Sequence, residues 1–357
     1  MPHTKKKGTR KHLLLLRFSA MGDVAMTVPL VSALAAQYPD LKITVVTRAS
    51  FKSFFEGMPN VAVYETNFDK QHKGLMGLWR LYRELRGLHV YAVADLHNVL
   101  RSKVITFLFK RRGKKTATTD KMREARKALT AEKNKRFEPI PAVIERHAIT
   151  VAQLGFPVTL DARAIRPALT LSEDVLAYTG HHNEMWIGIA PFAQHRSKVY
   201  PRELMQEVIS GLAIRPGTKI FLFGGGRDEE HQLKKFAEGM PNVLVAAGNK
   251  LSMKQELQII SNLDVMLSMD SGNGHLAAMY GVKVISLWGA THPYAGFAPF
   301  NQPLSNSLTA DRGQYPLLPT SVYGNKNVPG YEDAMHTITP QMVISKVESL
   351  LAEGLKS

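Results

Sequence analysis

The feature that most constrains the fold is an alternation of short apolar runs with amphipathic segments, which occurs in both halves of the chain. In the first half, the apolar runs predict strands and the segments between them predict helices. The predicted strands cover residues 11–18, 41–47, 61–64 and 90–96, and the predicted helices cover residues 24–37, 51–56 and 77–86. Repeated strand–helix units of this kind predict a parallel sheet with helices on both faces.

The same alternation restarts after residue 185. Strands are predicted over residues 186–190, 219–223, 243–246, 265–267 and 282–288, and helices over residues 202–213, 228–238 and 340–353. Thr339 and Pro340 have the residue types that favour the start of the last helix. Two such series predict an α/β protein with two doubly wound domains, residues 12–170 and 171–340, after a basic tail at residues 1–11. The linker is expected within residues 166–184.

Composition narrows the functional classes. The chain has no cysteine, which excludes disulfides and cysteine-ligated zinc and agrees with a cytoplasmic location. It has no apolar run of about 18 residues, so the sequence predicts no membrane-spanning helix. The formal net charge of +16 implies an acidic partner, which could be nucleic acid, an anionic membrane surface or a phosphorylated substrate. Much of this charge lies in residues 110–136, which either form a solvated face or bind such a partner.

The stretch from Asp270 to His275 is the strongest candidate for a ligand site. It lies between a predicted strand and a predicted helix, and Gly272 lets the backbone approach a ligand closely. Ser271 offers a hydroxyl, and the amides of a helix start suit a diphosphate. The alternative is an ordinary capped helix. The next strand ends near Thr291, so both turns are expected at the carboxyl edge of one parallel sheet, where open α/β sheets bind ligands.

Three other predicted strand ends carry polar residues. Gly22 and Asp23 follow the first strand, where a carboxylate can act as a general base or can cap the next helix. Lys198 follows the strand at residues 186–190, and a lysine there can neutralise a leaving diphosphate or can lie on the surface. Glu229 follows the glycines at residues 224–226, where a carboxylate can accept hydrogen bonds from a ribose. A glycine run can also be no more than a tight turn.

Taken in order, these segments resemble the heptosyltransferases of glycosyltransferase family nine. The resemblance is carried by R-F-S-A-M-G-D-V at 17–24, D-L-H-N-V-L-R-S at 95–102, K-V-Y-P at 198–201, D-S-G-N-G-H-L-A-A at 270–278 and W-G-A-T-H-P at 288–293. It implies a GT-B fold, with two Rossmann-like doubly wound domains facing a cleft. The first domain would bind the acceptor and the second the nucleotide sugar, and the helix in residues 341–357 would pack back on the N-terminal domain.

The resemblance also implies a mechanism, an inverting transfer of a sugar from a nucleotide diphosphate without a metal ion or another cofactor. Asp23 would take the proton of the acceptor hydroxyl, and Lys198 would stabilise the departing diphosphate. The implied donor-binding residues are Gly22, Glu229, Asp270, Ser271, Gly272, His275 and Thr291, and the implied acceptor-binding residues are His97, Asn98 and Arg101. His97 and Asn98 stand where the family pattern has Gln-Gly, which is a departure at the implied acceptor site. Related chains often carry several cysteines before the final helix, and their absence here predicts a different subgroup with a different acceptor.

The expected function is therefore transfer of a heptose from ADP-heptose to a lipopolysaccharide core or a related anionic glycolipid. The basic run at residues 110–136 would meet this acceptor at the inner leaflet of the cytoplasmic membrane, as a peripheral contact. The alternatives are a GT-B enzyme with another nucleotide-sugar donor, a nucleotide-sugar epimerase, and a degenerate relative that only binds nucleotide. A nucleic-acid-binding protein is the alternative from another class, although no recognition motif supports specific binding. The donor sugar, the acceptor and the oligomeric state are not determined by the sequence.

Overall fold

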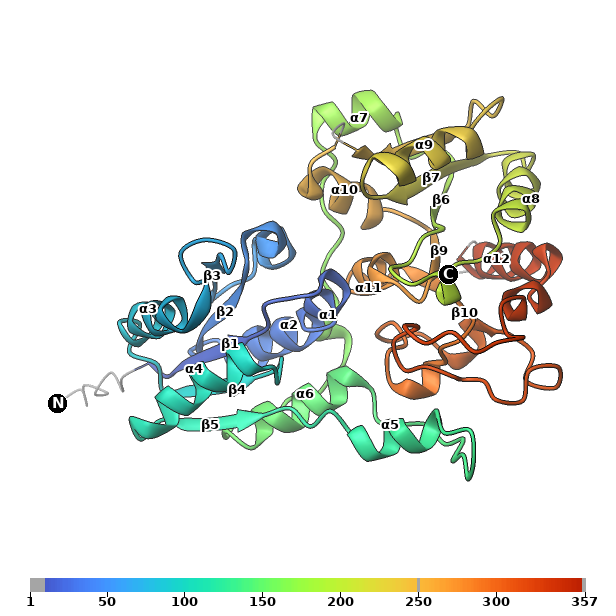
Figure 1. The fold of residues 1–357 in the computed structure, drawn as a ribbon. Coiled ribbons are helices and arrows are strands. Elements are labelled where there is room, and N and C mark those ends of the chain that lie inside the picture. Colours follow the sequence, from blue (N-terminus) through green and yellow to red (C-terminus); the bar gives the residue numbers. More distant parts are fainter. Residues whose placement is uncertain (1–9, 249–250, 355–357) are drawn as a thin grey trace. The chain divides into compact units, whose positions relative to one another are not determined.

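The computed structural model describes residues 10–248 and 251–354, so most of the expected basic tail lies outside the described residues (Figure 1). The chain divides into two compact units. Unit 1 comprises residues up to Lys121 together with Val143–Ile165, and unit 2 comprises Met122–Ala142 together with residues from Arg166 onward. The second crossing, at residue 165, is close to the expected boundary at 170. The early passage of residues 122–142 into unit 2 differs from the expected organisation.

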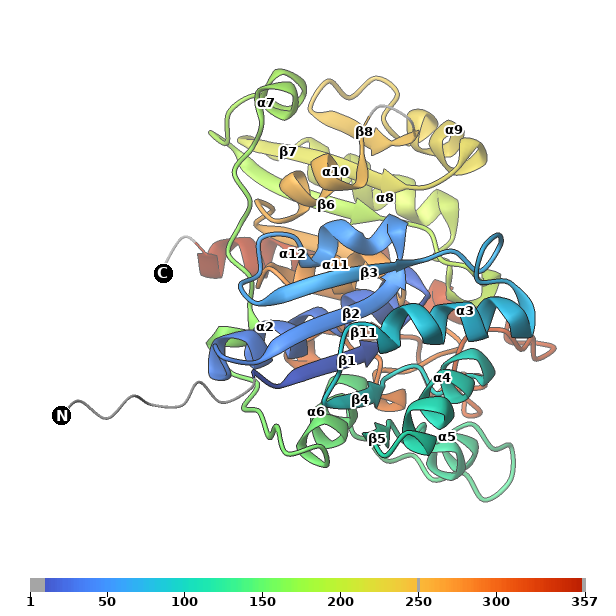
Figure 2. The same cartoon turned by 90° about the vertical axis from the view of Figure 1, so that its left-hand side faces the viewer.

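Unit 1 is built on a parallel sheet with the strand order β3-β2-β1-β4-β5. The helix α3 packs beside α4, and α2 packs beside α6; Figure 2 shows α3 and α4 in front of the sheet. The strands are β1 (His12–Leu16), β2 (Lys42–Arg48), β3 (Val61–Thr66), β4 (Ala92–Asp95) and β5 (Lys115–Thr118). The helices are α1 (Met21–Ala25), α2 (Val28–Gln37), η1 (Ala49–Phe55), α3 (Gly74–Arg86), α4 (Leu100–Arg111), α6 (Val143–Ala152) and η2 (Ala162–Ala164).

The four predicted strands of unit 1 are confirmed as β1, β2, β3 and β4, and the central ones are buried on both faces. Every residue of β1 is buried, as expected for a central strand between two helix layers. The predicted helix over residues 24–37 is wrong in detail, because the structure divides it into α1 and α2. Pro29 lies in the first turn of α2, where the missing N–H costs nothing, and its ring is compatible with a new helix start.

Unit 2 contains a second parallel sheet, with the order β11-β10-β9-β6-β7-β8. Renumbered within the unit, this is the 3-2-1-4-5-6 order of a dinucleotide-binding Rossmann domain. The strands are β6 (Met185–Ala190), β7 (Thr218–Gly224), β8 (Val243–Ala247), β9 (Val265–Met269), β10 (Lys283–Trp288) and β11 (Ser307–Thr309). The helices are α5 (Arg123–Leu129), α7 (Glu173–Thr179), η3 (Arg196–Lys198), α8 (Arg202–Ala213), α9 (Arg227–Phe236), α10 (Met253–Ile260), α11 (Gly272–Ala278), η5 (Pro293–Ala295), η6 (Leu304–Asn306), η7 (Ala334–Thr337) and α12 (Pro340–Gly354).

The final helix α12 belongs to the core of unit 2. Its apolar face, with Val347 and Leu351, is buried against α8, β9 and β10. Gly211 of α8 allows this approach, because a Cβ at that position would lie 2.6 Å from Cδ1 of Ile344. The apolar stripe of this helix thus matches the groove beside α8, and its expected packing on the N-terminal domain stays a prediction.

The segment at residues 122–142 is held on unit 2 by cations stacked on aromatic rings. The guanidinium of Arg126 lies 4.7 Å from the ring centre of Phe297 and donates to Tyr323 Oη at 2.8 Å. Lys135 Nζ donates to the carbonyl of Pro319 at 2.8 Å. The basic run at residues 110–136 is therefore not one surface, because part of its charge is used inside unit 2. Residues Lys110–Lys115 are exposed on unit 1.

Within residues 10–248 and 251–354, no helix combines the length and apolar character that are needed to cross a membrane.

Candidate functional site

Each sheet has one place where the strand order reverses, and the predicted site residues gather there. In unit 1 the reversal lies between β1 and β4, whose carboxyl ends lead to Asp23 and to His97 and Asn98. In unit 2 it lies between β6 and β9, which lead to Lys198 and to Asp270. Ligands of open α/β sheets bind at such reversals, because the loops diverge and leave a crevice beyond the strand ends. Each unit therefore brings its predicted residues to the edge where binding is expected.

Asp23 lies in the first turn of α1 and forms an ion pair with Arg17. The distance from Arg17 Nη2 to Asp23 Oδ2 is 2.5 Å, and Arg17 Nη1 donates to the carbonyl of Leu96 at 2.8 Å. The arginine is buried, whereas the side chain of Asp23 keeps 32% of its surface exposed. Arg17 thus fixes the carboxylate and leaves it accessible to a reactant. Its role was missed in the sequence, although it begins the same motif as Asp23.

The turn after β4 is organised by Asp95, which is fully buried. One carboxylate oxygen accepts hydrogen bonds from the amides of His97 and Asn98, and the other accepts from the hydroxyl of Ser102 at 2.9 Å. Burial is the largest influence on this carboxyl and raises its pKa. Asn98 adopts a positive φ of 52°, and its side-chain nitrogen Nδ2 donates to the carbonyl of Thr119 at 2.8 Å. This contact makes Asn98 a brace of the turn.

His97 and Arg101 extend the same edge. Burial, followed by the nearby charge of Arg17, lowers the pKa of His97 to about 3, so the imidazole is neutral at physiological pH. Its ring packs edge-on against Phe18, with centroids 5.5 Å apart. Arg101 is exposed in the first turn of α4 and stacks 5.0 Å from the ring centre of Phe68. This edge therefore offers the neutral ring of His97, which interacts electrostatically with Asp23, and the exposed cation of Arg101.

Lys198 and Asp270 meet at the strand reversal of unit 2. Lys198 Nζ lies 2.9 Å from Asp270 Oδ2, and both side chains are largely buried. The carboxylate pairs with the ammonium, which carries three N–H donors and can therefore also bind a ligand. The pair therefore presents an oriented cation at the carboxyl edge of the sheet.

The turn after Asp270 starts α11. Ser271 is the N-cap residue and its hydroxyl lies 3.1 Å from the hydroxyl of Ser268. Among the described residues, no side chain caps the first turn of α11, where Gly272 lies. Gly274 brings the helix close to the sheet, since a Cβ there would lie 3.4 Å from Ser268 and Val284. His275 is buried in the same turn.

Glu229 and Thr291 occupy the flanks of this edge. Glu229 Oε2 accepts a hydrogen bond from the amide of Gly225 at 2.7 Å, so one carboxylate oxygen closes the turn after β7. Thr291 is buried in the loop after β10, and its hydroxyl has no hydrogen-bond partner in the part of the chain that the structure describes. A buried hydroxyl without a partner is costly unless a ligand or water satisfies it.

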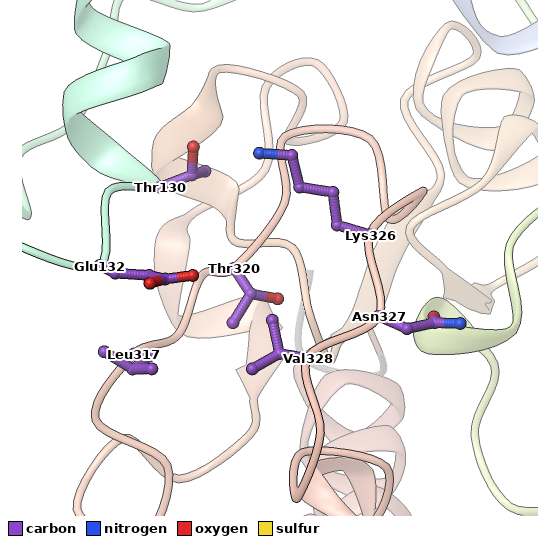
Figure 3. A pocket seen from close by; sticks show the side chains of 7 residues that line it. All are labelled: Thr130, Glu132, Leu317, Thr320, Lys326, Asn327 and Val328. Carbon is purple, nitrogen blue, oxygen red and sulfur yellow. The ribbon is translucent and has the colours of Figure 1, made fainter.

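A pocket of about 280 Å³ lies within unit 2 (Figure 3). It is bounded by Thr130 and Glu132 of the 122–142 segment and by residues of the loop that follows β11, namely Leu317, Thr320, Lys326, Asn327 and Val328. None of the predicted site residues lines it. No group of three or more histidine, aspartate or glutamate side chains that could hold a metal ion is present among the described residues.

Comparison with known proteins identifies the family of the chain. The family model described as glycosyltransferase family 9 (heptosyltransferase) matches residues 78–329. Lipooligosaccharide heptosyltransferase 2 of Haemophilus influenzae is 27% identical over 360 residues, which cover 96% of this chain and 100% of that protein.

Solved structures show the same fold. The glycosyltransferase family 9 protein of Veillonella parvula matches with a TM-score of 0.75 at 18% identity, over 98% of this chain and 100% of that chain. The E. coli ADP-heptose lps heptosyltransferase II matches with a TM-score of 0.66 at 20% identity, over 96% of this chain and 99% of that chain. The expected GT-B fold is confirmed, and the epimerase and nucleic-acid-binding alternatives are set aside. The chain belongs to glycosyltransferase family 9 and is a glycosyltransferase.

Proposed function

We propose that the protein transfers a heptose from ADP-heptose, with inversion, onto a lipopolysaccharide core or a related anionic glycolipid. The observation that carries this proposal is the pairing of Lys198 with Asp270 at the strand reversal of a Rossmann-type sheet. The heptosyltransferase names of the relatives support the sugar and the acceptor class. A different nucleotide sugar as donor is the remaining alternative.

In this mechanism unit 2 holds the donor. The Lys198 ammonium neutralises the charge that develops on the diphosphate as its bond to the sugar breaks, which is the step that most needs electrostatic stabilisation. The amides of Ser271 and Gly272 add donors, and Thr291 supplies a buried hydroxyl. Glu229 holds the ribose. Because a lysine can supply this positive charge, we expect transfer to persist in excess EDTA.

Unit 1 supplies the base. An acceptor hydroxyl attacks the anomeric carbon, the bond from that carbon to the diphosphate oxygen breaks, and the proton passes to the carboxylate of Asp23. Attack from the side opposite to the leaving group inverts the anomeric configuration. Arg17 holds the carboxylate in place, while His97 and Arg101 bind the acceptor beside it.

A nucleotide-sugar panel tests the donor. At a concentration of about 100 times its Kd, ADP-heptose should stabilise the folded protein by about 2.7 kcal/mol and raise its melting temperature by several degrees. UDP-N-acetylglucosamine should have little effect. Lys198→Ala should reduce the shift, whereas Lys235→Ala, an exposed lysine on α9, should not. Stabilisation by a UDP-sugar with none by ADP-heptose would exclude the proposed donor.

We also propose that unit 1 makes a peripheral contact with the anionic inner leaflet of the cytoplasmic membrane. The neighbouring helices α3 and α4, seen together in Figure 2, carry exposed large apolar side chains, including Met76 at 88% exposure and Trp79 at 52%. Arg80 and Arg83 follow on α3, and residues 110–115 add a basic cluster. Apolar side chains that insert between lipids, flanked by cations, are the features of a peripheral membrane surface.

Vesicle sedimentation tests this surface. Charge reversal at four exposed positions should release the protein from vesicles containing anionic lipid, because each basic residue near such a surface contributes about 1 kcal/mol. The positions are Arg111, Arg112, Lys114 and Lys115. Reversal of four exposed basic residues on unit 2, Arg202, Lys234, Lys235 and Lys254, changes the net charge by the same amount and provides the control. Unchanged sedimentation of the fourfold variant would refute the proposed contact.

A further inference from the structure

The side chain of Lys198 lies against the backbone of Gly324. A Cβ at Gly324 would stand 2.4 Å from Lys198 Cδ and 2.5 Å from Cγ, which is closer than real side chains approach. The aliphatic stem of the lysine thus occupies the space that any other residue at 324 would need. Gly324 also has a φ of +80°, a conformation that glycine adopts readily. Two independent features, space and backbone angle, therefore require glycine here.

A closed circuit of hydrogen bonds joins the loops around this contact. Ser197 Oγ donates to the carbonyl of Gly324 at 2.6 Å, and the amide of Gly324 donates to Ser321 Oγ at 2.9 Å. The amide of Ser321 donates to the carbonyl of Ala290 at 3.1 Å, and the amide of Ala290 donates to the carbonyl of Ser197 at 3.1 Å. The residue before Lys198 is thereby tied to the loop after β10 and to the turn at residues 321–324.

We infer that Gly324 and Ser197 are positioning residues for the Lys198 ammonium. A free lysine has a flexible four-carbon stem, so ordering it against a diphosphate costs conformational entropy. Gly324 confines the middle of the stem, Asp270 fixes its end, and Ser197 anchors the turn that carries it. The ammonium is then already placed when charge develops in the transition state, which is where a preorganised cation is most effective. The inference rests on the proposed role of Lys198 in transfer.

Gly330 provides a matched control for the backbone. It has nearly the same positive φ, +79°, but a Cβ there would meet no atom within 4 Å. Gly324→Ala and Gly330→Ala therefore share the conformational cost, and only Gly324→Ala displaces the lysine. With ADP-heptose as the donor, we expect Gly324→Ala to lower kcat about tenfold to a hundredfold below Gly330→Ala, since a displacement of about 1 Å can have such an effect. The KM for the donor should change less, because the cation acts mainly in the transition state.

Combination with Lys198→Ala separates positioning from general loss of structure. If Gly324 acts through Lys198, the double variant should be no less active than Lys198→Ala alone. Additive losses, or equal activity of Gly324→Ala and Gly330→Ala, would overturn the inference. Full activity of Lys198→Ala would instead overturn the proposed function of the lysine, so the two failures are distinguishable.

Ser197 provides a second test that does not depend on the folding of Gly324→Ala. Ser197→Ala removes the hydrogen bond to the carbonyl of Gly324 and should lower kcat several-fold, whereas the melting temperature should fall by only a few degrees, as for the loss of one hydrogen bond. Ser197→Thr keeps the hydroxyl and should restore most of the activity. Equal activity of the two variants would contradict the positioning role of Ser197.

Discussion

At the residue scale, the candidate site consists of charges whose partners define their orientation. Asp23 is held by Arg17, and Lys198 is held by Asp270. The sequence indicated Asp23, Lys198 and Asp270 because each follows a recognisable strand end. It could not indicate the contacts of Ser197 or Gly324, because these depend on loops that are distant along the chain. Asn98 was predicted to bind the acceptor, and that assignment stays a prediction beside its contact with Thr119.

Asp23→Asn tests the proposed base. The amide has nearly the same shape as the carboxylate but accepts no proton, so transfer should fall by about 10²- to 10⁴-fold, the range that is typical of a lost general base. Binding of ADP, measured by calorimetry, should remain, because Asp23 lies in unit 1 and the proposed donor residues other than Gly22 lie in unit 2. Turnover close to that of the original protein would remove Asp23 from the mechanism.

His147 on α6 predicts a pH dependence of stability. Burial lowers its pKa to about 3, and the charges of Arg17 and Arg146 act in the same direction. The folded state therefore keeps this imidazole neutral, whereas the unfolded chain binds a proton below about pH 6.5. Stability from this group is present above that pH and is lost as the pH falls, by about 2 kcal/mol between pH 7 and pH 5. In thermal melts, His147→Leu should show a shallower decline over this range; an identical decline would exclude His147 as its source.

At the element scale, strands that are buried on both faces were predicted well, and helix α8 matches its predicted bounds. Residues 97–165 were not assigned, because the edge strand β5 is short and polar and its neighbours α4 and α5 are rich in basic residues. The placement of α12 could not be predicted from the sequence alone. Its amphipathic pattern shows that one face is buried and does not show which groove receives it.

Leu351→Ala tests the placement of α12. The side chain is almost fully buried in the unit 2 core, so its truncation should cost about 2–5 kcal/mol of unfolding free energy. Met342→Ala, at an exposed position of the same helix, should change stability by less than about 0.5 kcal/mol. Hydrogen exchange should show weaker protection in α8 and β9. Loss of protection confined to the strands of unit 1 would contradict this packing.

At the scale of the whole molecule, the sequence indicated two Rossmann-like domains and the GT-B fold. It did not reveal that residues 122–142 leave the first unit and join the second. This passage depends on stacking between Arg126 and Phe297, residues that no short pattern connects. The run of basic residues at 110–136 does not form one surface for a related reason. A run of charges in the sequence does not show which of its cations, such as Arg126 and Lys135, bind other groups of the same unit.

The central claim is that this chain moves a heptose from ADP-heptose to an anionic glycolipid with inversion. The most direct measurement is NMR analysis of the product formed from ADP-heptose and a heptose-deficient lipopolysaccharide core. The account predicts one heptose added for each ADP released, with an anomeric configuration opposite to that of the donor. A product that retains the donor configuration, or an unaltered acceptor while another nucleotide sugar is consumed, would contradict it.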